Sequence, residues 1–120
     1  MNSTKRDSGD KPGSPVIEPV TLAVDQLRRA GADPTVPHQT RHFIYVPGVK
    51  AAQNLARLLK NPRRIVELDT SARKGYWLVV VRQSIVVTPE AMAALRTEFE
   101  AAAAPIGGEY DRWQVDLQGG

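Results

Sequence analysis

Two carboxylates near the C-terminal end are the first side chains in this 120-residue sequence whose spacing could do chemistry. Glu109 and Asp111 stand two residues apart in "GGEYDRWQVD", which puts both on one face of a strand. Such a pair can act as general acid and base when its surroundings push the two pKa values apart. The neighbouring sequence predicts no deep pocket, so we interpret both carboxylates as surface groups rather than catalysts.

The two histidines are the other candidates, because His38 and His42 are four residues apart and would pair as metal ligands on a helix. Pro37 and the run "FIYV" favour a strand there instead. The sequence has no cysteine, which excludes thiolate nucleophiles and cysteine-ligated metals. It also has no GxSxG, HExxH or Walker-type loop. We therefore predict a protein that is not an enzyme and that binds no cofactor and no metal.

The elements that would position these residues follow from hydrophobic periodicity. Apolar residues alternate in strand candidates and recur at three- and four-residue spacing in helix candidates. Thr88-Pro89-Glu90 is a helix start with a hydroxyl cap, and Gly107-Gly108 is a helix stop. In chain order the predicted elements are the strand "RHFIYV", the helix "VKAAQNLARLLKN", the strands "RIVELD" and "YWLVVVRQ", the helix from Thr88 to Ile106, and the closing strand "EYDRWQV".

This order of strand, helix, strand, strand, helix, strand is the split βαβ arrangement. Because crossovers are right-handed, it predicts an α+β ferredoxin-like fold (βαββαβ), with a four-stranded antiparallel sheet and two helices on one face. A short N-terminal helix, "TLAVDQLRRA", precedes it. We expect residues 1-18 to form a disordered tail, residues 19-40 to hold the short helix and a linker, and residues 41-120 to form the ferredoxin-like domain.

The closing strand is expected to be anchored by its two aromatic residues, Tyr110 and Trp113. On a regular strand, Trp113 would share a face with Glu109 and Asp111, and Tyr110 would point to the other face.

The first residues are polar and carry no apolar signal-peptide core, and no segment approaches the roughly twenty apolar residues of a membrane span. We expect a soluble protein of the cytoplasm with no membrane partner. The net charge of +3 is spread unevenly, because the basic residues between Arg41 and Arg82 face only Glu67 and Asp69. This asymmetry is compatible with an acidic partner or a nucleic acid backbone, with an ordinary solvated surface as the alternative.

The second half of the chain carries a family resemblance. The run "WLVVVRQSIVVTPEAMAALRTEFEAAAAPIGGEYDRW" resembles the C-terminal half of the regulator of ribonuclease E activity B family, which closes on Glu-Tyr-Asp-x-Trp. "RHFIYVPGVKAAQNLARLL" is similar to the family's first strand and helix, so the resemblance covers about residues 21–116. It implies a ferredoxin-like fold and a protein inhibitor that binds ribonuclease E and lowers its RNA cleavage. In this chain the motif residues are Glu109, Tyr110, Asp111 and Trp113.

One face of the predicted sheet has no helix and is the candidate binding surface. If His42 and Ile44 face the helices, Phe43 and Tyr45 face outward. We predict that a partner is contacted by Phe43, Tyr45 and Trp77, with Arg63, Arg64, Arg73 and Lys74 as a basic rim. Three occupants remain open: another protein or a second copy of the chain forming a homodimer, the tail or leading helix, and single-stranded RNA stacked on the aromatic residues.

Overall fold

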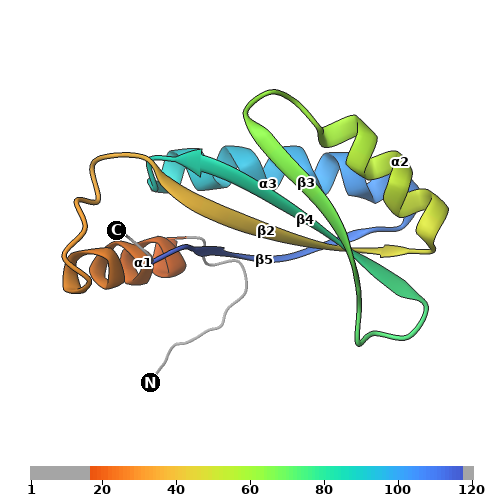
Figure 1. Ribbon diagram of the computed structural model, residues 1–120, viewed down its shortest axis with the longest axis horizontal. Coiled ribbons are helices and arrows are strands. Elements are labelled where there is room, and N and C mark those ends of the chain that lie inside the picture. Colours follow the sequence, from red (N-terminus) through yellow and green to blue (C-terminus); the bar gives the residue numbers. More distant parts are fainter. Residues whose placement is uncertain (1–16, 118–120) are drawn as a thin grey trace, which may run out of the picture.

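The chain folds around one four-stranded antiparallel sheet in the computed structural model, which describes residues 17–117 (Figure 1). In chain order the elements are α1 (Ile17–Arg29), β2 (His38–Pro47), α2 (Val49–Leu59), β3 (Arg64–Thr70), β4 (Tyr76–Ile85), α3 (Pro89–Ala103), the short 3-10 helix η1 (Ala104–Ile106) and β5 (Glu109–Val115). The strands lie in the order β3-β4-β2-β5, with β2 and β4 in the centre. This is the ferredoxin-like arrangement, so the predicted α+β fold is confirmed.

Helices α2 and α3 lie on the same side of the sheet and touch each other. α2 packs on β3 and β4, while α3 packs on β5 and β2 and passes behind the strands in Figure 1. Right-handed crossovers from β2 to β3 and from β4 to β5 place both helices on one side. No helix among the described residues packs on the opposite side of the sheet, which is called the open face below.

The core fills the layer between the sheet and these helices. Its completely buried apolar side chains include Ile44, Val46, Leu55, Val79, Val81, Met92 and Phe99. Ile44 and Val46 alternate along β2 with Phe43 and Tyr45, which are only partly buried. The prediction that Phe43 and Tyr45 point to the open face is therefore confirmed.

α1 packs beside α3 and leaves the open face free. Val20 and Ala23 join the main core cluster, and Leu27 is completely buried. The helix starts at Ile17, earlier than the predicted start at Thr21. Residues 1–16 of the predicted disordered tail lie outside the described residues, and residues 17 and 18 belong to α1. The division of the chain into a linker and a domain at residue 40 stays a prediction.

Strand β2 also begins earlier than predicted, at His38 rather than Arg41. Thr40 pairs with Gln83 of β4 on one side and with Val115 of β5 on the other. Asp116 donates its backbone N–H to the Gln39 carbonyl at 2.8 Å. Pairing on both sides thus extends the strand beyond the apolar run from which it was predicted.

The ends of α3 follow the predicted signals. Thr88 caps the first turn, since its hydroxyl accepts a hydrogen bond from the Ala91 N–H at 3.1 Å, and Pro89 occupies the first helical position. After the 3-10 turn η1, Gly107 adopts the left-handed conformation with φ 74°. This conformation turns the chain from the helix layer back into the sheet.

Replacement of Gly107 by alanine is expected to lower the free energy of unfolding by about 1–2 kcal/mol, because a Cβ is disfavoured at positive φ. The added Cβ would also lie 3.4 Å from Pro47 Cγ. Urea denaturation followed by circular dichroism measures the loss. Gly107→Asn is the matched control and should lose less, because asparagine tolerates this conformation. Equal stability of all three proteins would contradict the assigned role.

A β-bulge interrupts β5 in the middle of the family motif. Phe43 pairs with Arg112, but the next residue, Ile44, pairs with Tyr110, so Asp111 is an extra residue on β5. As a result Tyr110 and Trp113, three residues apart, both pack against the core. The prediction that they point to opposite faces is wrong, because it assumed a regular strand.

Candidate functional site

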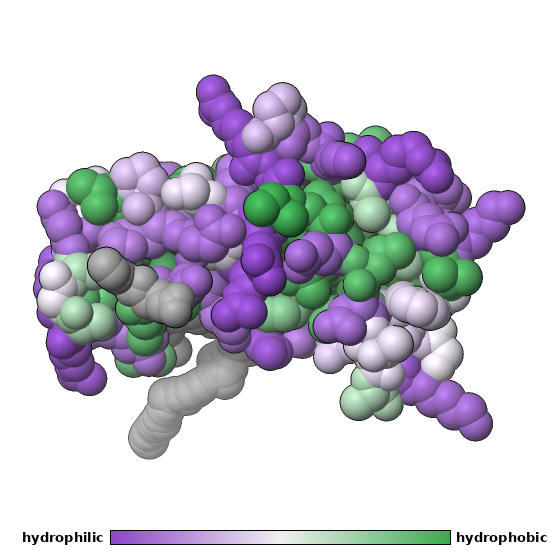
Figure 2. Space-filling view, viewed as in Figure 1, coloured by the Kyte–Doolittle hydropathy of each residue, from purple (hydrophilic) through white to green (hydrophobic). Residues whose placement is uncertain are grey.

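The open face is a four-stranded surface whose side chains form rows across the sheet (Figure 2). Its residues, from β3 across to β5, are Ile65, Glu67 and Asp69, then Tyr76, Leu78, Val80 and Arg82, then Arg41, Phe43 and Tyr45, and finally Glu109, Arg112 and Gln114. Figure 2 looks onto this side and shows hydrophobic side chains gathered over the sheet among hydrophilic ones. The face therefore has an apolar centre and a charged surround.

The centre is built from the middle row and the row next to it. Val80 lies opposite Phe43, and Leu78 lies opposite Tyr45, so an aliphatic residue of β4 meets an aromatic residue of β2 in both rows. Tyr76 extends the patch toward the β3–β4 turn. Tyr76 was not predicted as a residue of this surface. It lies on the same face of β4 as Leu78, but the pairing of β4 with β2 is needed to show that this is the open face.

Arginine side chains lie over the aromatic rings of this patch. The Arg112 guanidinium carbon is 4.6 Å from the centre of the Phe43 ring. The Arg73 carbon is 4.1 Å from the Tyr76 ring centre and 5.4 Å from that of Tyr45. These are cation–π distances, so each of the three rings has a guanidinium of the same chain beside it.

Arg73 also joins the turn to the closing strand through an ion pair. Its Nη1 donates to Glu109 Oε1 at 2.9 Å. The hydrogen bond with Arg73 lowers the pKa of Glu109, and its counterpart raises the pKa of Arg73. Glu109 is thus held ionised by a cation and has no means of accepting a proton near neutral pH, which supports its interpretation as a surface group.

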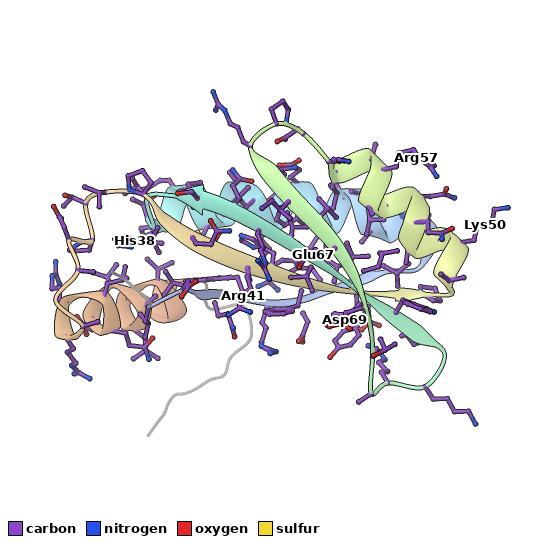
Figure 3. The ribbon with its side chains drawn as sticks, viewed as in Figure 1. His38, Arg41, Lys50, Arg57, Glu67 and Asp69 are labelled. Atoms are coloured by element: carbon purple, nitrogen blue, oxygen red, sulfur yellow. The ribbon has the colours of Figure 1, made fainter. Side chains whose placement is uncertain are left out.

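The other end of the open face is positively charged. Arg41 lies directly opposite Arg82, and Glu67 contacts Arg82 at 3.3 Å (Figure 3). The Arg41 side chain makes no hydrogen bond or ion pair with another of residues 17–117. The Nε of Arg82 has no acceptor there either, but this atom is buried. The Arg41 guanidinium at this end can therefore donate to an acidic group of a partner.

Trp77 does not belong to the open face, which corrects the prediction. It pairs with Val46 and packs against the core on the helix side. The strand "YWLVVVRQ" is apolar on both faces, so the sequence contained no polar alternation from which to assign its sides.

Arg64 is also misplaced by the sequence prediction, because its side chain is only 7% exposed. It donates two hydrogen bonds to Glu98 of α3, at 2.8 and 2.7 Å, and one to Gln83 Oε1 at 2.7 Å. Its guanidinium lies 5.0 Å from the centre of the Phe99 ring. The hydrogen bonds from Arg64 lower the pKa of Glu98. Arg64 therefore ties β3 to α3 and is not a rim residue.

The remaining rim candidates lie at opposite ends of the β3–β4 hairpin. Arg73 and Lys74 belong to the turn between β3 and β4, whereas Arg63 precedes β3 and belongs to the turn after α2. The structure thus brings Arg73 beside Tyr45 on the open face, with Lys74 in the same turn and Phe43 in the next row, and it separates Arg63 from them.

Behind the sheet, the family motif takes part in a buried polar network. Thr40 Oγ1 donates its one proton to the Gln83 carbonyl at 2.8 Å. It must therefore accept the hydrogen bond that joins it to His42 Nε2 at 3.0 Å. His42 Nδ1 is then left to accept the Tyr110 hydroxyl at 3.1 Å. Burial, together with the charge of Arg64, lowers the pKa of His42 to about 4, and burial raises the pKa of Tyr110. The motif therefore anchors β5 to the core, as predicted for Tyr110 and Trp113.

The described helices include none with the length and apolar character of a membrane span. No curated protein sequence matches the chain. Residues 21–115 match the sequence profile of the regulator of ribonuclease activity B, which covers the whole sheet and nearly all of the described helices. With the ferredoxin-like fold and the Glu109-Tyr110-Asp111-x-Trp113 closing strand in place, the chain belongs to the regulator of ribonuclease activity B family.

Proposed function

We propose that this protein is a non-enzymatic regulator that acts in the cytoplasm by binding a ribonuclease, with ribonuclease E as the first candidate, and lowering its RNA cleavage. The observation that carries the proposal is the apolar centre of the open face, which no described helix covers. The side chains of this centre are half-buried, apart from the buried Val80, and an apolar patch with a polar surround that no helix covers is typical of protein-binding surfaces.

The charges around the patch support a protein partner with an acidic segment. The Arg41 side chain makes no hydrogen bond or ion pair with another of residues 17–117, and Lys74 lies in the turn at the far end. Acidic side chains of a partner would meet these donors and fix its orientation, while the aromatic residues supply the apolar contact.

The aromatic rings favour a protein over single-stranded RNA on this face. RNA-binding sheets use the flat surfaces of free aromatic rings to stack bases. Here the rings of Phe43, Tyr45 and Tyr76 already lie beside Arg112 and Arg73. A stacked base would have to displace these guanidinium groups, whereas a protein side chain can pack around them.

The test replaces two aromatic residues of the patch, Phe43→Gln and Tyr76→Gln together, and measures binding to purified ribonuclease E by isothermal titration calorimetry. Because interface aromatic residues often contribute 2 kcal/mol or more each, we expect affinity to fall on the order of 100-fold or more. The matched control is Leu22→Gln with Leu58→Gln, which removes two exposed apolar side chains from α1 and α2 and should leave the affinity unchanged. Circular dichroism establishes that both variants remain folded.

Two results would overturn the proposal. One is an unmodified protein that does not bind ribonuclease E at physiological salt. The other is a homodimer in analytical ultracentrifugation that the Phe43→Gln and Tyr76→Gln pair dissociates, since the open face would then be occupied by a second copy of the chain.

A further inference from the structure

A second charged surface lies on α2 and the turn that follows it. Residues 49–63 contain Lys50, Arg57, Lys60 and Arg63 and no acidic residue. All four side chains are exposed, whereas Ala52, Leu55 and Leu59 hold the opposite side of the helix in the core. We name the four cations the α2 basic face. It belongs to the helix layer and therefore lies on the other side of the sheet from the open face.

These cations differ from most arginines of the described chain in having no acidic partner there. Six arginines elsewhere meet carboxylates, in the pairs Asp25–Arg28, Arg64–Glu98, Arg73–Glu109, Glu67–Arg82, Arg96–Glu100 and Asp111–Arg112, although Arg41 does not. On the α2 basic face, Arg57 instead donates to the Asn54 amide oxygen at 3.0 Å. The charge of this face is therefore not neutralised by residues 17–117.

The positions of the cations are only partly explained by the stability of the helix itself. Lys50 lies in the first turn, where the positive end of the helix dipole disfavours a cation, and Gly48 provides no side-chain cap. Arg57 and Lys60 are three residues apart with the same charge, which also disfavours the helix. Arg57 in the last turn and Lys60 at the C-cap do complement the dipole. Helix stability therefore does not account for all four cations, since Lys50 opposes the dipole and Arg63 lies beyond the end of the helix.

The geometry suits an extended polyanion. Lys50 and Arg57 project outward from α2 (Figure 3), and seven residues of helix separate them by about 10 Å. The exposed amides of Gln53 and Asn54 lie between them on the helix and can donate to the same ligand. No aromatic residue occurs in residues 49–63, so the face can contact a backbone but cannot stack bases.

We propose that the α2 basic face binds the phosphate backbone of single-stranded RNA without sequence preference. The family regulates ribonuclease activity, so RNA is the polyanion that its target handles. The α2 basic face belongs to the helix layer and projects at the edge of the view onto the open face (Figure 3), so the two surfaces are distinct and RNA and a ribonuclease can be held at the same time. This binding does not depend on the ribonuclease contact.

The test measures binding of a fluorescein-labelled single-stranded RNA of about 20 nucleotides by anisotropy, as a function of salt. Each phosphate contact lowers the logarithm of affinity with a slope of about 0.7 per unit of log salt, so four contacts give a slope of about −3. Affinity should then fall about 50-fold between 50 and 200 mM salt. Neutralising the face with Lys50→Gln, Arg57→Gln, Lys60→Gln and Arg63→Gln should abolish most of the binding and bring the slope close to zero.

The matched control has the same net charge but keeps the α2 basic face: Arg28→Gln, Arg29→Gln, Arg41→Gln and Lys74→Gln. It should retain the slope of the unmodified protein. Loss of binding in the control as large as in the α2 variant would overturn the proposal, because net charge alone would then explain it. Absence of RNA binding by the unmodified protein at 50 mM salt would overturn it too.

A competitor separates RNA from an acidic protein surface. Poly-glutamate at equal charge concentration should displace the RNA weakly, and displacement as effective as by unlabelled RNA would contradict the proposal. The two binding surfaces are tested independently. The α2 variant should still bind ribonuclease E, and the variant with Phe43→Gln and Tyr76→Gln should still bind RNA with the unchanged slope.

Discussion

Replacement of Phe99 by alanine is expected to lower the free energy of unfolding by about 4 kcal/mol, which is a large part of the stability of a domain of this size. Phe99 is completely buried at the centre of the helix layer. Its ring lies 5.0 Å from that of His42 and 6.1 Å from that of Tyr110, and the Arg64 guanidinium lies over it. Truncation therefore opens a cavity and also removes the contacts that orient two polar groups.

Urea denaturation at pH 7, followed by circular dichroism and tryptophan fluorescence, measures this loss. Leu58→Ala is the control, since Leu58 is 69% exposed on α2 and its truncation should change stability by less than about 0.5 kcal/mol. A Phe99→Ala protein as stable as the control would mean that the core is not organised around this ring.

Acidification is expected to destabilise the protein by about 3 kcal/mol through His42 alone. The pKa of His42 is lowered from 6.5 to about 4 in the folded state by burial and by Arg64. Between these two pH values the unfolded chain binds a proton that the folded chain does not, so the free energy of unfolding falls as pH falls. The contribution of neutral His42 is fully present above about pH 6.5 and is lost as pH falls toward 4.

The measurement is a series of urea denaturations between pH 7 and pH 4. His42→Gln should flatten the pH dependence in this window, although the variant is less stable at pH 7 because its hydrogen bonds with Thr40 and Tyr110 are lost. His38→Gln is the control at the other histidine, and it should leave the His42-dependent slope in place. Stability that stays constant from pH 6.5 to 4.5 in the unmodified protein would refute the assignment.

Carboxylates act in a lower pH range and can be separated from His42. The pKa of Glu98 is held below its usual value of 4.5 by hydrogen bonds from Arg64, and that of Glu109 by Arg73. Their stabilising effect is present above about pH 4.5 and is lost as pH falls below it. The His42 contribution is thus the one that changes between pH 6.5 and 4.5.

Much of the fold could be predicted from local sequence signals. Thr88, Pro89 and Gly107 mark the ends of the second long helix, and each adopts the backbone role that its chemistry predicts. The order of the strands and helices then leaves few arrangements, because crossovers are right-handed. Strand periodicity also predicted that Phe43 and Tyr45 share one face, but it left open which face, because "FIYV" is apolar throughout; the burial pattern of β2 decides this.

The site was less predictable because it depends on contacts between distant residues. Trp77 was assigned to the wrong side because β4 is apolar on both faces, and only its pairing with Val46 determines its orientation. Arg64 was expected at the surface, as arginines usually are, but Glu98, 34 residues away, provides the partner that allows its burial. Tyr76 was missed for the same reason as Trp77.

The bulge at Asp111 has a consequence for how the length of this strand can vary. Two residues lie between Tyr110 and Trp113, and without Asp111 there would be one. Both aromatic side chains would still point inward, because alternate residues of a regular strand share a face. The motif spacing thus reflects an insertion accommodated without loss of either anchor. Gain or loss of a single amino acid between these aromatics is expected to be tolerated, provided that the bulge forms or disappears with it.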